Sequence, residues 1–135
     1  MFSNKNITYS TEYDCDSFFI HITIGEKQFK NSMMCTLYRE IDTIKIDDIF
    51  VCKDIDNCYN YKKHINKGYG TRMMNMLLEF AKANNYRKII GNLSPHDNSD
   101  RYDNSHRERQ IHFYKKFGFN ILPDEDTPCG IELLL

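Results

Sequence analysis

A glycine-containing turn near the middle of the chain has the residue types of an anion-binding site. It precedes a stretch with helical periodicity and consists of Asn66, Lys67, Gly68, Tyr69, Gly70 and Thr71. Free N–H groups and the dipole at the start of a helix attract anions, and glycines let the backbone approach a phosphate closely. Residues 61–90 contain seven Lys or Arg and one acid, so positive charge is concentrated around the turn. The turn alone leaves two interpretations open, a phosphate site and an ordinary glycine turn before a helix.

A second segment places a tyrosine within an aromatic and basic sequence. It reads Ile111, His112, Phe113, Tyr114, Lys115, Lys116, Phe117, Gly118 and Phe119. A phenol that is held at hydrogen-bond distance from a leaving group is able to donate a proton to it. A tyrosine on the inner side of a helix is more often a core residue, so its position alone does not establish a chemical role.

The elements that must position these two segments follow from hydrophobic periodicity. The first half of the chain predicts three strands and a short edge strand, at residues 18–24, 29–38, 43–52 and 7–12 respectively. Residues 53–66 are polar and irregular, which is typical of a loop. Apolar residues then recur at helical spacing from Met73 to Ala81, and Asn84 with Asn85 is suited to end this helix.

The second half of the chain predicts a strand, a long polar loop, a helix and two final strands. Their ranges are residues 88–93, 94–106, 107–117, 119–122 and 130–135, with Gly118 placed to end the helix. The unit of strand, helix and strand from Thr43 to Leu93 should form a parallel, right-handed crossover. The predicted fold class is α/β (α+β), with a mixed, mostly antiparallel central sheet flanked by helices. One domain is expected to span residues 1–135.

Composition excludes several classes of function. The formal net charge of −1 argues against nucleic acid as a partner. No apolar run approaches the ~18 residues that a membrane span needs, and no signal peptide is visible, so we expect a cytoplasmic protein. The five cysteines include no C-x-x-C pair, and the acidic and histidine side chains of residues 96–106 lack the spacing of a calcium loop. We therefore expect no disulfide framework and no metal.

Taken together and in this order, the two segments resemble the GCN5-related N-acetyltransferase (GNAT) superfamily. The family carries a strand ending in a pattern like L-x-V, a basic loop Q/R-x-x-G-x-G/A that opens a helix, and a later block F-Y-x-K-x-G-F. The matching parts of this chain are residues 49–51, 67–71 and 113–119, and the resemblance covers about residues 43–122. Residues 91–95 and 107–119 are also similar to small acetyltransferase-like proteins of bacteria and their phages.

The resemblance implies that acetyl-CoA is the cosubstrate and assigns roles to particular residues. The strands at Ile49 and Leu93 are expected to splay and admit the pantetheine arm, and Tyr114 to protonate the departing thiolate. Backbone amides around Val51 and Cys52 would hold the arm and polarise the thioester carbonyl. The expected cofactor-binding residues are Phe50, Val51, Cys52, Asn66, Lys67, Gly68, Tyr69, Gly70, Thr71 and Phe113.

The resemblance leaves the base and the acceptor open. Asp47 and Asp48, on the expected active-site strand, are candidate bases, and a solvated strand face explains them equally well. The amine acceptor is a small molecule or a protein, and the chain is a monomer or a homodimer. Position 65, where the family has Gln or Arg, is Ile, and the first strands lack the pair of helices that often builds the acceptor pocket. The leading hypothesis is an N-acetyltransferase that acts by direct attack on acetyl-CoA. The alternative is a catalytically inactive CoA-binding or protein-interaction module on the same fold.

Overall fold

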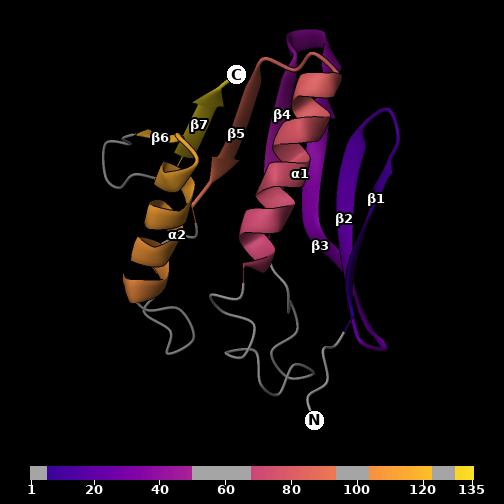
Figure 1. Ribbon diagram of the computed structural model, residues 1–135. Coiled ribbons are helices and arrows are strands. Elements are labelled where there is room, and N and C mark those ends of the chain that lie inside the picture. The colour runs from indigo at the N-terminus through magenta and orange to yellow at the C-terminus, as the bar shows by residue number, and fades with distance from the viewer. Residues whose placement is uncertain (1–5, 50–67, 94–103, 123–129) are drawn as a thin grey trace.

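The computed structural model describes residues 6–49, 68–93, 104–122 and 130–135, which form one seven-stranded sheet and two α-helices (Figure 1). The elements in chain order are β1 (Ile7–Tyr13), β2 (Ser17–Ile24), β3 (Lys27–Tyr38), the 3₁₀ turn η1 (Arg39–Ile41), β4 (Thr43–Ile49), α1 (Tyr69–Ala83), β5 (Lys88–Asn92), α2 (Asn104–Lys116), β6 (Asn120–Leu122) and β7 (Gly130–Leu134). The sheet order is β1-β2-β3-β4-β5-β7-β6, and β4 and β5 are its parallel pair. The predicted fold class and the parallel crossover are therefore confirmed.

Most predicted boundaries agree with the structure, and the beginning of the second helix differs. α1 ends at Ala83, where Asn84 is the C-cap and Asn85 adopts a left-handed φ of 63°. α2 begins at Asn104, so the prediction of a loop through residue 106 is wrong at its end. The first turn of α2 contains no large apolar residue, and apolar periodicity therefore could not mark it.

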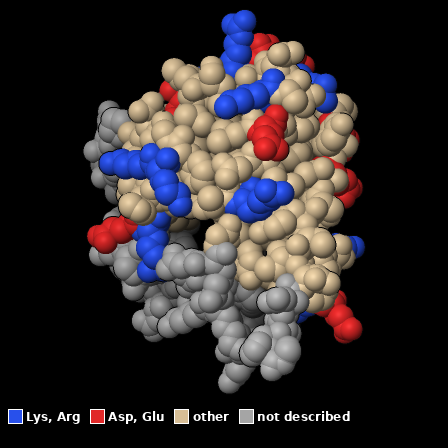
Figure 2. Space-filling view, in the orientation of Figure 1, with Lys and Arg blue, Asp and Glu red and all other residues tan. Residues whose placement is uncertain are grey.

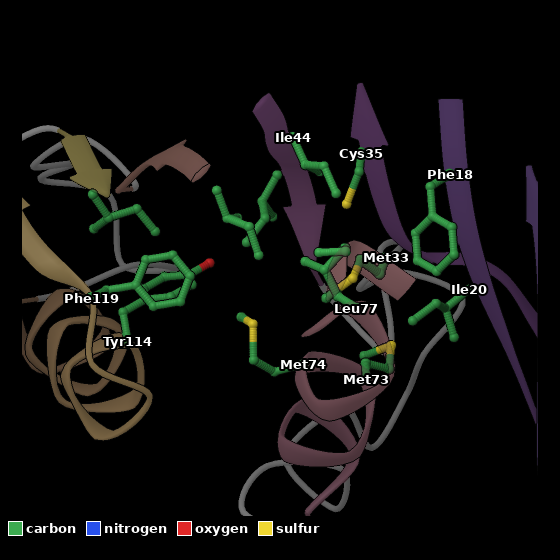
Figure 3. Packing of buried hydrophobic residues seen from close by; sticks show 14 of the residues in the cluster. Phe18, Ile20, Met33, Cys35, Ile44, Met73, Met74, Leu77, Tyr114 and Phe119 are labelled. Carbon is green, nitrogen blue, oxygen red and sulfur yellow. The ribbon is translucent and has the colours of Figure 1, made fainter. Parts of the chain in front are cut away.

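Both helices cover the same face of the sheet, and the core lies between them and the strands (Figure 1). On β2 every second residue from Phe18 to Ile22 is buried, which is the alternation expected of a strand with one covered face. The helices contribute their apolar residues to the same core, notably Met73, Met74 and Leu77 of α1 (Figure 3). On the opposite face, no helix of the described residues covers the sheet.

Strands β4 and β5 separate partway along their length. Their ladder runs from Thr43↔Lys88 to Ile46↔Gly91. Beyond it β4 continues to Ile49 alongside β3, while Asn92 of β5 pairs with β7. The predicted splay of this parallel pair is thus present, and the edge of β4 that follows Ile46 is not paired with β5.

Gly91 lies at the point where the strands separate, and a side chain would not fit there easily. A Cβ at this position would lie 3.3 Å from the side chain of Ile131 and 3.4 Å from the carbonyl oxygen of Ile46. Glycine therefore lets the three strands approach one another closely at the last β4–β5 pair.

Candidate active site

The glycine turn opens α1 as predicted, and Gly68 at its start is exposed. Gly68 is the N-cap residue, with a left-handed φ of 82°, a conformation that glycine adopts without a steric penalty. It has no side chain to accept a hydrogen bond from the first turn, and the first turn contains no acidic residue. Among the described residues, no atom outside its immediate chain neighbours lies within 4 Å of the position that a Cβ at Gly68 would take. This arrangement favours an external anion at the positive end of the helix dipole.

The second predicted segment packs directly against this helix start. A Cβ on Gly70 would lie 3.2 Å from the ring of Phe113, so α2 reaches α1 where glycine leaves room for the ring. The Nζ of Lys116 donates a hydrogen bond to the Oγ1 of Thr71 at 3.3 Å. Phe113, Gly70 and Thr71, which lie in two separate motifs of the sequence, therefore form one local cluster.

Lys116 is a functional candidate that is not among the site residues predicted from the sequence. Its ammonium group lies 5.7 Å from the ring centre of Phe113 and 5.5 Å from that of Phe117, which holds the side chain against α2. Its contact with Thr71 places a positive charge beside the N-terminus of α1. Figure 2 shows basic side chains gathered on this face of the molecule, over α2. The lysine of the F-Y-x-K-x-G-F block was the available signal in the sequence.

Tyr114 is buried in the core, with 4% of its surface exposed. Its ring packs edge-on against Phe113 and Phe119, with 5.3 Å between ring centres in each case. Figure 3 shows its hydroxyl pointing away from α2, into the space between that helix, Met74 and the strand that carries Ile44. The side chain therefore projects from α2 toward the sheet.

The environment of Tyr114 keeps its phenol protonated. Burial is the main reason that its pKa is raised well above the ordinary value, and charge on Cys35 or Asp48 adds to the effect. Cys35 is itself buried, and burial together with Asp47 raises the pKa of its thiol, so it is neutral at physiological pH. Asp48 is consequently the neighbouring charge that matters there. A buried, protonated phenol is a donor of a hydrogen bond or a proton.

Raising the pH above about 9 should lower the free energy of unfolding. The ordinary pKa values of cysteine and tyrosine are 9.0 and 10.0, and both are raised in the folded protein at Cys35 and Tyr114. The unfolded chain releases these protons first, so it binds fewer protons than the native state, and stability falls by about 1.4 kcal/mol per pH unit for each group. Urea denaturation midpoints measured across this range should show the fall, and it should be shallower in both Cys35→Ala and Tyr114→Phe. An unchanged pH dependence in Tyr114→Phe would contradict the burial of the phenol.

The two candidate bases lie at a β-bulge where β4 begins to diverge from β5. Cys35 pairs with Ile46 and Met34 with Asp48, so Asp47 is the extra residue of β4. Asp47 is exposed, and its Oδ2 accepts a 2.6 Å hydrogen bond from the Oγ1 of Thr36. Bulges re-aim side chains and are common beside active sites. The structure thus fixes the orientation of Asp47 through Thr36, a partner that the sequence did not indicate.

Several predicted site residues lie outside the described residues. They are Phe50, Val51, Cys52, Asn66 and Lys67. Within the described ranges, no three His, Cys, Asp or Glu side chains are grouped as metal ligands would be. None of the helices in those ranges is long and apolar enough to cross a membrane.

Comparison with known proteins identifies the family. The model of the acetyltransferase (GNAT) domain matches residues 34–121, which include β4, α1, β5 and nearly all of the F-Y-x-K-x-G-F helix and strand. The chain therefore belongs to the GNAT acetyltransferase domain family.

One curated relative and several solved structures are similar to parts or all of the chain. YocC, an uncharacterised protein of Bacillus subtilis (strain 168), is 34% identical over 65 residues, which are 48% of this chain and 36% of YocC. The PaiA N-acetyltransferase of Thermoplasma acidophilum, solved with coenzyme A, has a TM-score of 0.60 at 11% identity and is matched over 89% of this chain and 62% of its own. A GNAT family acetyltransferase of Elizabethkingia anophelis, solved with acetyl-CoA, has a TM-score of 0.59 at 16% identity, with 96% and 99% covered.

These comparisons differ in what they cover. The match spans about a third of YocC and less than two thirds of the Thermoplasma enzyme, while the Elizabethkingia protein is matched over nearly its whole length. At these identities the solved structures establish the fold of the chain.

Proposed function

We propose that this protein transfers an acetyl group from acetyl-CoA to a primary amine. The observation that carries the proposal is the convergence of three features at one place in the fold. The start of α1 and Lys116 would form an anion site, the edge of β4 beyond Ile46 is not paired with β5, and Tyr114 is a buried, protonated phenol. The GNAT structures solved with coenzyme A or acetyl-CoA support this assignment by their fold.

The residues of the chain suggest how the cosubstrate would be held. The N–H groups of residues 68–71 and the ammonium of Lys116 would bind the pyrophosphate, an anion matched to a helix start. The edge of β4 beyond Ile46 would pair with the pantetheine amides much as an added strand does. Phe113 would pack beside the same arm, because its ring already contacts the start of α1 at Gly70.

The chemistry follows from the groups on either side of the thioester. The amine nitrogen attacks the carbonyl carbon, a C–N bond forms and the C–S bond breaks. The thiolate that departs takes the proton of Tyr114, and the amine releases its own proton to Asp47 through water. We favour Asp47 over Asp48 as the base because Asp47 is exposed and held by Thr36, whereas the charge of Asp48 opposes ionisation of Tyr114.

Replacing Asp47 by Asn should lower kcat/KM for the amine about 10-fold while leaving the affinity for acetyl-CoA unchanged. The amide keeps the hydrogen bond from Thr36 but accepts no proton at neutral pH. Steady-state kinetics of CoA release check this, with Asp48→Asn as the matched control at the neighbouring position. A larger loss in Asp48→Asn than in Asp47→Asn would reverse the assignment of the base.

A second candidate function is a CoA-binding or interaction module without catalysis. The observation that favours it is the packing of Tyr114, which resembles that of an ordinary core tyrosine between Phe113 and Phe119. The two functions differ in whether acetyl-CoA is consumed when an amine is present. Turnover of acetyl-CoA that depends on the Tyr114 hydroxyl supports the enzyme, and binding without turnover supports the module.

A further inference from the structure

A cavity that is open to solvent lies on the face of the sheet that α1 and α2 leave uncovered. Its volume is about 360 Å³, and it is lined by Tyr38, Ile41, Lys45, Ile90, Gly91 and Asn92. Lys45 alternates along β4 with Ile44 and Ile46, which are buried under the helices, so its side chain belongs to the opposite face. The cavity is therefore separated by the sheet from the helices that carry Lys116 and Tyr114.

The cavity reaches the place where β4 and β5 part. Lys45 pairs with Ile90 in the last but one position of the ladder, and Gly91 belongs to its last pair. A molecule in the cavity would thus lie beside the opening between the strands, which the proposed pantetheine arm approaches from the other side. An amine at the Gly91 and Asn92 end would be the part nearest to the thioester.

The charged side chains around the cavity differ in whether they already have a partner. Glu132, which pairs with Ile90 across β5 and β7, lies 3.7 Å from the Nζ of Lys88 and is engaged in that ion pair. Asp47 accepts the hydrogen bond of Thr36. Among the residues that the structure describes, Lys45 makes no ion pair. Its ammonium group is the cationic member of the cavity lining, and a carboxylate is a suitable partner for it.

Apart from Lys45 and Asn92, the residues that line the cavity are largely apolar. Ile41 is 66% exposed and Tyr38 is 39% exposed, although both are large apolar side chains. Ile90 also lines the cavity. A ligand with an apolar body would cover these residues and gain the free energy of removing them from water. The volume lies at the small end of the range of small-molecule sites, about 300–1,000 Å³.

We propose that this cavity binds the acetyl acceptor, and that the acceptor is a small primary amine with a carboxylate and an apolar body, such as an apolar α-amino acid. Lys45 pairs with the carboxylate, Ile41 and Tyr38 contact the apolar body, and the amine faces the opening at Gly91. The inference rests on the proposed acetyl transfer and names the substrate class for the same site. It makes Lys45 a specificity-determining residue.

The test compares amines that differ by the carboxylate alone. Leucine is paired with isoamylamine and phenylalanine with phenethylamine, and CoA release is measured with each at a fixed, saturating concentration of acetyl-CoA. The wild type should have a KM at least about 10-fold lower for the amino acid of each pair. Lys45→Glu should remove or invert this preference through KM, with kcat changed far less, and Lys45→Arg should retain it. Ile41→Asp should raise KM for all four amines.

The outcomes separate this inference from the proposed function. Equal KM values within each pair, unaffected by Lys45→Glu, would overturn the role of Lys45 while leaving acetyl transfer intact. Acetyl-CoA binding without acetylation of any of the four amines would overturn the proposed acceptor class. If acetyl-CoA raises the melting temperature of neither the wild type nor Lys45→Glu, cofactor binding itself fails and the inference fails with it.

Discussion

Tyr114→Phe should reduce the turnover number for acetyl transfer by roughly 100-fold or more. A positioned general acid typically contributes 10²–10⁴-fold, and phenylalanine removes only the hydroxyl that would supply the proton. The ring contacts with Phe113 and Phe119 remain, so the fold should be preserved. The dissociation constant for acetyl-CoA should change by less than about twofold, because the hydroxyl acts on the departing thiolate.

The comparison of kcat with cofactor affinity makes this prediction specific. Isothermal titration calorimetry gives the dissociation constant for acetyl-CoA, and timed assays of CoA release give kcat. Both are measured on the same preparations. Far-UV circular dichroism and a urea midpoint close to that of the wild type serve as the control for folding. Unchanged turnover in a folded Tyr114→Phe variant would exclude the tyrosine as the acid and favour a role in core packing alone.

Lys116→Glu should weaken the binding of CoA by roughly 100-fold. A hydrogen bond to a charged group contributes about 1.5–3 kcal/mol, and the reversed charge adds repulsion at the start of α1. Lys116 sits there because its Nζ bonds to Thr71 and its side chain lies over the rings of Phe113 and Phe117. The loss should diminish at high salt, because screening weakens both the lost attraction and the new repulsion.

Lys115→Glu is the matched control for this measurement. It changes the net charge by the same amount, at the neighbouring residue of α2, and Lys115 is exposed. Calorimetric titration of both variants with CoA should show near wild-type affinity for Lys115→Glu and a large loss for Lys116→Glu. Equal losses in the two variants would indicate a general effect of charge, and no loss in either would remove Lys116 from the site.

The sequence predicted the parts of the fold whose signals are local. The glycine turn before α1, the glycine that ends α2 and the alternation along β2 each depend on residues close together in the chain. Gly118 shows why such signals are reliable, since its φ of 92° is a conformation that other residues rarely adopt. The family resemblance assigned Phe113 and the α1 turn to one site, and in the structure the ring of Phe113 lies beside Gly70.

The features that the sequence did not predict depend on register and on distant pairing. Thr36 bonds to Asp47 at the place where a bulge in β4 shifts the β3–β4 register between Met34 and Cys35. Lys116 and Thr71 are 45 residues apart, and their contact requires the packing of α2 against the start of α1. To predict the cavity at Lys45, one would have to know which face of the sheet the helices cover. No periodicity or motif carries that information.

The most direct test of acetyl transfer measures both products of the reaction at once. Acetyl-CoA and a panel of amines, with and without carboxylates, are incubated with the protein, and free CoA and acetylated amine are quantified by thiol titration and mass spectrometry. If the protein transfers acetyl groups to amines, the two products form in equal amounts, and Tyr114→Phe slows the formation of both. Release of CoA without acetylated amine, or no reaction with any amine despite binding of acetyl-CoA, would contradict this function.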